Sequence, residues 1–243
     1  MMPMASERED LETHIKTCLS FLDTHFISVG AAKNVAKVFS STEKEAVKAL
    51  KATVVFHDYG KAAQEYQQKA SSRKLSFPKH EYFSAAAAWQ TLADTSWKTE
   101  CIIAILWHHM AMRGPNFAVD IKTWDKFKAP ESATIVERFV EVFREILQYH
   151  ELDDVVVGDP PEKITFAQVD DLTKKMYQAI NQLESGMTVY RRSLKLLRPL
   201  LIVDNLAAAH HRGGLERVFV KDLPNPKSVL SDASVIQKLV KYV

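Results

Sequence analysis

The chain has 243 residues, of which 47% are hydrophobic and 26% are charged, as in globular proteins with one medium-sized core. These values exclude a disordered, collagen-like or coiled-coil chain. The net charge of +2 is too small to favour or exclude a polyanionic partner.

The sequence carries no sign of a membrane segment. The longest strongly apolar run, residues 101–107, is too short to span a bilayer. The acidic first ten residues lack the pattern of a signal peptide, and Cys18 and Cys101 form neither a metal-spaced pair nor a disulfide framework. We therefore expect a cytoplasmic protein without membrane contact.

Nucleotide-binding loops are also excluded. None of the seven glycines forms a G-x-G-x-x-G motif. The only Gly-Lys pair, Gly60-Lys61, has Val55 where a P-loop has its first glycine and Ala62 where it has Ser or Thr. An ATP-driven motor within this chain is therefore not expected.

Helical patterning runs through almost the whole chain. Possible capping boxes, Ser6 with Glu9 and Thr42 with Glu45, indicate helix starts, and apolar residues recur at helical spacing from residue 11 to 26. We expect one compact all-α domain over residues 1–214 and a C-terminal tail over 215–243 that packs on the domain or serves in docking. Further helices are predicted over 42–57, 60–70, 80–94, 97–109, 131–150, 165–184, 188–211 with a kink at Pro199, and 228–242.

Two adjacent pairs of potential metal ligands stand out among nine histidines. Neighbouring side chains on a regular helix diverge by about 100°, so they converge on one site only where the helix ends. His57 and Asp58 precede Gly60, a residue type that ends helices in a left-handed conformation, and His108-His109 closes another predicted helix. The single histidines that could complete a cluster are His14 and His80.

The order of these residues resembles the HD phosphohydrolase superfamily, and within it most closely the stand-alone HD nuclease of type I CRISPR systems. The similarity covers about residues 10–211. Met110 departs from the family, which often has glycine there, and Asp204 lies in a loose pattern for which Asp170 and Asp171 are alternatives. Three local patterns carry the resemblance: His-Asp-Tyr-Gly-Lys from 57 with Gln64 and Tyr66-Gln67, residues 79–85, and residues 105–109.

The resemblance implies a dinuclear metal site between helices. One ion would be held by His14, His57, Asp58 and Asp204, and the second by the bridging Asp58 with His80, His108 and His109. This mixture of imidazoles and carboxylates favours Mn, Fe, Co, Ni or Zn over Mg or Ca. Asp58 and Lys61 would be the catalytic residues, since the Lys61 cation would neutralise charge on the phosphoryl oxygens.

By the same resemblance, the chain would hydrolyse phosphodiester bonds of single-stranded DNA in CRISPR interference, with RNA in an R-loop as a further substrate class. A separate helicase subunit would act in trans, and an RNA-guided surveillance complex would present the displaced strand. Arg113, Arg191 and Arg198 could line a path for the strand, or could belong to solvated charged faces.

Two other interpretations stay open. A small-molecule HD phosphohydrolase, such as a nucleotidase or cyclic-nucleotide phosphodiesterase, would use the same metal chemistry. A non-enzymatic helical adaptor would hold a structural ion or none. His25 and His150 suit packing roles better than ligand roles, and His210-His211 could cap the C-terminus of its helix.

Overall fold

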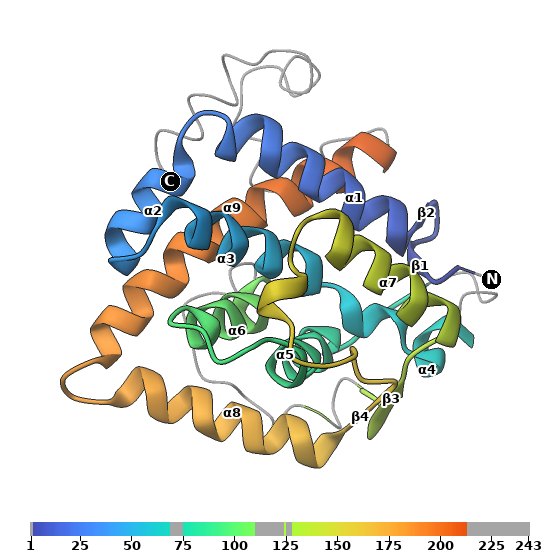
Figure 1. Cartoon of the computed structure of the whole chain (residues 1–243). Helices are drawn as coiled ribbons and strands as arrows, with labels where there is room; N and C mark the ends of the chain where they lie inside the picture. Colours follow the sequence, from blue (N-terminus) through green and yellow to red (C-terminus); the bar gives the residue numbers. More distant parts are fainter. Residues whose placement is uncertain (1, 69–74, 110–123, 125–127, 213–243) are drawn as a thin grey trace.

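The computed structural model describes residues 2–68, 75–109, 124 and 128–212, and this part of the chain is mainly helical (Figure 1). The predicted all-α class is confirmed. The two short antiparallel ribbons are β1 (Met4–Ser6) with β2 (Glu9–Asp10), and β3 (Ser132–Thr134) with β4 (Lys163–Thr165). The helices are α1 (Leu11–Leu22), the π-helical turn η1 (Asp23–Ile27), α2 (Ala31–Phe39), α3 (Glu43–Phe56), the 3-10 turn η2 (Tyr59–Ala62), α4 (Gln64–Gln67), α5 (His80–Thr91), α6 (Lys98–Trp107), α7 (Glu137–Tyr149), the 3-10 turn η7 (Asp153–Val155), α8 (Phe166–Asn181) and α9 (Gly186–Arg212).

The predicted capping box at the first helix is wrong. Helix α1 begins at Leu11, and its N-cap is Asp10, whose carboxylate accepts a hydrogen bond from the Thr13 backbone N at 2.8 Å. Ser6 and Glu9 instead pair across the β1–β2 ribbon. This pairing places Glu9 just before α1 with only 3% of its surface exposed.

Other helix boundaries follow the hydrophobic pattern more closely. The capping box of Thr42 and Glu45 at the start of α3 is confirmed. The helix predicted over 60–70 is shorter and broken, because η2 and α4 take its place, and the one predicted over 131–150 begins only after β3. Pro199 lies inside α9. The predicted domain boundary at 214 and the tail helix over 228–242 lie outside the described residues.

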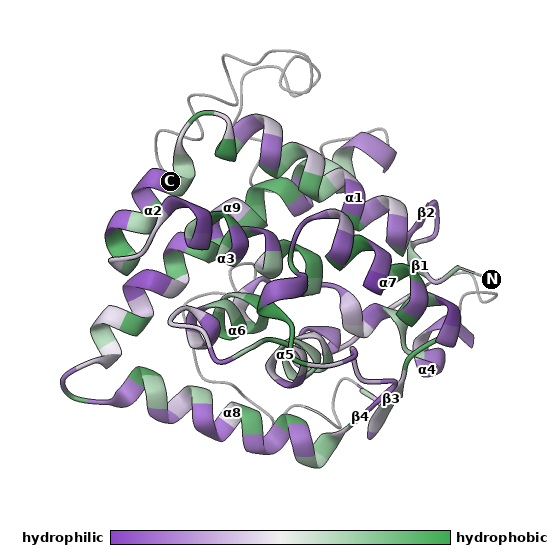
Figure 2. Cartoon of the chain, in the orientation of Figure 1, coloured by the Kyte–Doolittle hydropathy of each residue, from purple (hydrophilic) through white to green (hydrophobic). Residues whose placement is uncertain are grey.

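The core lies where α6 packs against α9, α5 and α3, and where α1 packs against α9 and α3. Aromatic rings extend it toward α7: Phe56 and Tyr59 both contact Phe143, with ring centroids 5.0 and 4.6 Å apart. The peripheral helix α8 alternates between hydrophilic and hydrophobic residues (Figure 2), as expected of a helix with one buried face. None of the described helices is long and apolar enough to cross a membrane.

This packing determines where polar side chains from several helices can meet. Helix α3 contacts α1, α5, α6 and α9, so the residues that follow it lie among several helices. The ends of α3 and α6 and the beginning of α5 therefore meet beside α1 and α9. Segments nearly two hundred positions apart in the sequence thereby contribute to one buried cluster of polar side chains.

Candidate metal centre

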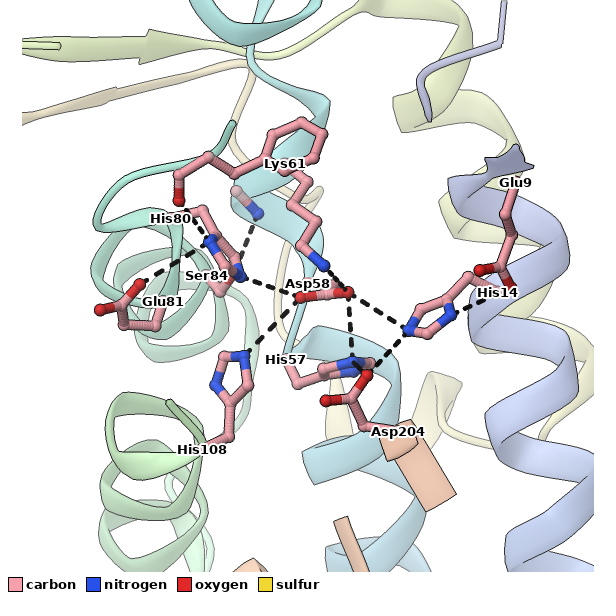
Figure 3. A network of polar contacts seen from close by, with 12 residues as sticks. Glu9, His14, His57, Asp58, Lys61, His80, Glu81, Ser84, His108 and Asp204 are labelled. Atoms are coloured by element: carbon pink, nitrogen blue, oxygen red, sulfur yellow. Dashed lines mark hydrogen bonds and ion pairs between the residues drawn. The ribbon is translucent and has the colours of Figure 1, made fainter. Parts of the chain in front are cut away.

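Asp58 lies at the middle of the polar cluster and is 1% exposed. Its Oδ1 is 3.0 Å from Nε2 of His80 and 3.7 Å from Nε2 of His108. Its Oδ2 is 3.3 Å from Nε2 of His57 and 3.4 Å from Nε2 of His14. The two oxygens of one carboxylate thus face two different groups of imidazoles (Figure 3).

Two sets of potential ligand atoms share Asp58, and within each set they all lie within 4.8 Å of one another; a third group, His14, Cys18 and His57, overlaps the first of them. In the first set, Asp204 Oδ1 is 3.2 Å from Nε2 of His14. In the second, Nε2 of His109 is 3.1 Å from Nε2 of His80. We call them the Asp204 set, consisting of His14, His57, Asp58 and Asp204, and the His109 set, consisting of Asp58, His80, His108 and His109.

Local backbone geometry orients three of the imidazoles in the same way. Each donates its Nδ1–H to the carbonyl of the residue three positions earlier. His57 donates to Val54 at 2.6 Å, His80 to Phe77 at 2.7 Å and His108 to Ile105 at 2.6 Å. The carbonyls of Val54 and Ile105 lie in the last turns of α3 and α6, where backbone acceptors lack regular intrahelical partners, and that of Phe77 lies just before α5. A bonded Nδ1–H leaves the lone pair on Nε2, as in metal-ligating histidines.

His14 is oriented differently because it lies inside α1. Its Nδ1 is 3.1 Å from Oε1 of Glu9, a side chain from β2. Sequence reasoning assigned Glu9 to a helix cap and missed this contact. It also missed Cys18, whose Sγ lies 3.7 Å from Nε2 of His14. The spacing of Cys18, one helical turn beyond His14, was a signal that could have found it.

The cluster contains buried atoms that protein groups leave unsatisfied. Nε2 of His57 and Nε2 of His108 have no hydrogen-bond partner in the described part of the chain. A buried polar atom without a partner costs roughly 1–3 kcal/mol. The 3.1 Å between the Nε2 atoms of His80 and His109 is close to the spacing of two nitrogens bound to one metal ion with bonds of about 2.1 Å. The clustered residues could therefore hold metal ions.

The electrostatics of the cluster also suit cations. Burial by itself would raise the pKa of Asp58, but neighbouring His57 and the Lys61 ammonium hold it well below its usual range. Burial likewise opposes ionisation of Asp204, yet the contact with His14 keeps its pKa low. Against the effect of burial, the Asp58 carboxylate raises the pKa of His108. Both carboxylates are thus ionised, which is the form that binds cations.

In two other imidazoles, the effect of burial on the pKa prevails. It lowers the pKa of His80. It also lowers that of His109, well below the usual range, together with repulsion from the adjacent His108 and from His80. Both side chains are consequently neutral near pH 7, which is the form that coordinates metal ions.

Lys61 reaches the cluster from η2 and is 8% exposed. Its Nζ donates a hydrogen bond to Oδ2 of Asp58 at 2.6 Å and lies 5.5 Å from the centroid of the Phe77 ring. The backbone carbonyl of Lys61 accepts a hydrogen bond from Nε2 of Gln67 at 2.7 Å. A fixed cation is thereby held beside the shared carboxylate.

Gly60 has a different role from the one predicted. Among the described glycines, only Gly30 has a positive φ, so Gly60 does not end the helix by a left-handed conformation. A Cβ at Gly60 would lie 2.3 Å from the carbonyl oxygen of His80. The Gly60 backbone N donates to Oγ of Ser84 at 2.8 Å. Glycine is needed here because η2 packs directly against α5, which brings Asp58 and His80 together.

The remaining histidine candidates lie outside both sets. His211 Nε2 is 3.0 Å from Oγ1 of Thr17 and 3.4 Å from Oε1 of Glu9. The ring of Phe21 lies beside His25 and His210, with centroid distances of 5.7 and 6.1 Å. These contacts favour packing and support roles over direct participation in either set.

The alternatives to Asp204 and the three arginines are also placed. Asp170 and Asp171 form ion pairs on α8 with the lysines four positions later, so they do not replace Asp204. Arg191 and Arg198 are exposed on α9. Arg113 lies outside the described residues. A contribution of the three arginines to nucleic-acid binding stays a prediction.

Comparison with known proteins adds a fold to this geometry. No protein-family model matches the chain, and no curated protein matches its sequence significantly. Among solved structures, the CRISPR-associated Cas3 HD domain protein of Methanocaldococcus jannaschii superposes with a TM-score of 0.57 and 15% sequence identity, covering 82% of this chain and 99% of that chain. The chain therefore has the fold of a Cas3 HD domain protein, and its histidine–aspartate cluster fits an HD-type metal site.

Proposed function

We propose that this chain is a metal-dependent phosphohydrolase of the HD type that cleaves phosphodiester bonds in single-stranded DNA. The observation that carries the proposal is the arrangement around Asp58, whose Oδ1 and Oδ2 face separate groups of imidazole Nε2 atoms. A carboxylate in this position suits a bridge between two cations. Two neighbouring ions can supply a nucleophile at neutral pH and neutralise both the attacking and the leaving oxygen of a phosphodiester.

The chain's own residues have separate tasks in this proposal. The Asp204 set would hold one ion and the His109 set the other, with Mn, Fe, Co, Ni or Zn favoured over Mg because imidazoles outnumber carboxylates. The backbone carbonyls behind His57, His80 and His108 keep the coordinating Nε2 atoms directed inward. Lys61 places a positive charge where the phosphoryl oxygens would gather negative charge.

The proposed biological setting is type I CRISPR interference, with RNA in an R-loop as a further substrate class. It is supported by the local motifs of the sequence and by the fold that the chain shares with the CRISPR-associated Cas3 HD domain protein of Methanocaldococcus jannaschii. Residues 1–243 contain no P-loop, so the proposed setting includes a helicase, acting in trans, that unwinds the strand. An RNA-guided surveillance complex would present the displaced strand.

The proposal is tested with covalently closed circular single-stranded DNA and a panel of mononucleotides and cyclic nucleotides. The chelated protein is assayed before and after addition of Mn²⁺, Co²⁺ or Ni²⁺, beside Asp58→Asn. Asp171→Asn is the matched control, because it makes the same carboxylate-to-amide change on an exposed residue of α8. We expect metal-dependent opening of the circles by the wild type and the control, and none by Asp58→Asn.

Other results would point to the rival functions. Hydrolysis of the nucleotide panel with intact circles would identify a small-molecule phosphohydrolase. No hydrolysis of any substrate, with a folded protein and bound metal, would favour the helical adaptor. Circular dichroism of each variant separates lost activity from lost folding.

A further inference from the structure

We propose that Glu9 is a positioning residue that holds the imidazole of His14 with Nε2 directed into the Asp204 set. In doing so it would set the affinity of that set for its ion. The inference rests on the proposed metal site, and it concerns a side chain outside both ligand sets. It is carried by the contact between Nδ1 of His14 and Oε1 of Glu9 at 3.1 Å, both residues being almost fully buried.

His14 requires such a partner because of where it lies. His57, His80 and His108 use a backbone carbonyl three residues earlier. In α1, where His14 is the fourth residue, the carbonyls of the helical residues accept the hydrogen bonds of the helix itself. His14 therefore needs a side-chain acceptor to do what a backbone carbonyl outside the regular helical pattern does for the others.

Helix geometry explains why the acceptor comes from the preceding strand. Side chains on an α-helix lean toward its N-terminus. His14 is in the first turns of α1, so its ring extends toward the residues that precede the helix. Glu9 lies there because β2 leads directly into α1. Figure 3 shows the Glu9 carboxylate beside the His14 ring, on the side away from Asp58.

Glu9 is itself held in place by two different parts of the fold. The ribbon that carries it is fastened to α4, because Gln67 accepts a hydrogen bond from the Met4 backbone N at 2.9 Å and donates one to the Met4 carbonyl at 3.0 Å. Oε1 of Glu9 also lies 3.4 Å from Nε2 of His211 near the end of α9. Glu9 thus contacts both helices that bring interior residues to the Asp204 set, α1 with His14 and α9 with Asp204.

A carboxylate behind a histidine ligand orients the ring and increases its basicity, and loss of such a partner typically weakens metal binding about 10- to 100-fold. The structure places this effect on one set only. Glu9 contacts His14, whereas the imidazoles of the His109 set have other partners for Nδ1 at His80 and His108. A role confined to general stability would not discriminate between the two ions.

The test is titration of the chelated full chain with Mn²⁺ by isothermal calorimetry, with metal content measured independently. Glu9→Met removes the acceptor and the charge at similar side-chain length. Glu9→Gln keeps a carbonyl oxygen that can accept from Nδ1–H of His14. Glu12→Met is the matched control, since Glu12 lies on α1, the helix that carries His14, and forms an ion pair with Lys16 at the surface.

We expect the wild type to bind two ions, and Glu9→Met to weaken one of them about 10- to 100-fold while the other keeps its affinity. Glu9→Gln should restore most of the loss, and Glu12→Met should bind like the wild type. Unchanged binding by Glu9→Met, equal weakening of both ions, or a Glu9→Gln variant as weak as Glu9→Met would overturn the inference. Absence of Mn²⁺ binding by the wild type would instead contradict the proposed function.

Discussion

The two ligand sets share Asp58, but their other residues come from different parts of helices. The His109 set takes its imidazoles from residues at or beside helix ends, His80 at the start of α5 and His108 and His109 after α6. The Asp204 set takes two members from helix interiors, His14 in α1 and Asp204 in α9. Helix ends bring neighbouring residues together, whereas helix interiors contribute single residues whose placement depends on packing between helices.

This difference decides what supports each set. Backbone carbonyls outside the regular helical hydrogen-bond pattern accept from Nδ1–H of His80 and His108, so these rings are oriented by local backbone. A helix interior offers none, so His14 uses Glu9. The Asp204 set therefore depends on a ribbon and two long helices, and the His109 set on local backbone geometry.

Replacing the shared carboxylate of Asp58 should impair both sets, so that neither keeps its ion. Asp58→Asn weakens the ligand of both prospective ions, because each oxygen of Asp58 faces one set. We expect loss of both ions and a fall in phosphodiesterase activity of at least about 1,000-fold, equivalent to about 4 kcal/mol of transition-state stabilisation. Metal analysis and single-turnover kinetics measure the two effects. Retention of both ions would show that Asp58 is not a bridge.

Removing a ligand that belongs to only one set should affect only the ion of that set. Asp204→Asn should lose the ion of its own set and keep the other, and His109→Ala should do the reverse. Activity should fall about 100-fold or more in each case, because both ions are needed to stabilise the two ends of the displacement. Metal stoichiometry tests the separation, with one ion per chain expected for both variants. If either single change empties the whole centre, the two sets are one cooperative site.

A substitution at Gly60, which packs against α5, should weaken the His109 set by disturbing the local packing. Alanine at Gly60 would place its Cβ 2.3 Å from the carbonyl oxygen of His80, so η2 would have to move away from α5. We expect Gly60→Ala to lower the free energy of unfolding by about 1–3 kcal/mol. The affinity of the His109 set for its ion should fall more than the affinity of the Asp204 set.

Denaturant unfolding and Mn²⁺ titration measure these effects. Gly158→Ala is the control, because a Cβ at Gly158 would meet nothing within 4 Å. Equal stability of the two alanine variants would mean that the close approach of η2 to α5 is dispensable.

The same contrast explains how much could be predicted from the sequence. Hydrophobic periodicity indicated most helices, and the adjacent pairs His57-Asp58 and His108-His109 are a local signal that helix geometry can interpret. Asp204 is a single residue on a long helix, and only its resemblance to a family pattern linked it to the site.

Two features depend on contacts that no local pattern encodes. The contact of Glu9 with His14 depends on a ribbon that ends before α1, whereas the spacing of Ser6 and Glu9 is typical of a helix cap. Glycine is required at position 60 because the carbonyl oxygen of His80 in α5, twenty residues later in the chain, leaves no room for a Cβ. Nothing around Gly60 in the sequence indicates that close approach.

The smallest of these effects should come from Lys61, which belongs to neither set. Its Nζ shares Oδ2 of Asp58 with the Asp204 set, so Lys61→Met leaves that oxygen more available for a cation while removing a positive charge near the phosphoryl group. We expect activity to fall about 10- to 100-fold with two ions still bound at unchanged or higher affinity. Lys48→Met is the control. Lys48 lies on α3, is largely buried like Lys61, and pairs with Asp154. A loss of metal that parallels the loss of activity would assign Lys61 to supporting Asp58 instead of the substrate, and would make the shared carboxylate depend on η2 as strongly as His14 depends on Glu9.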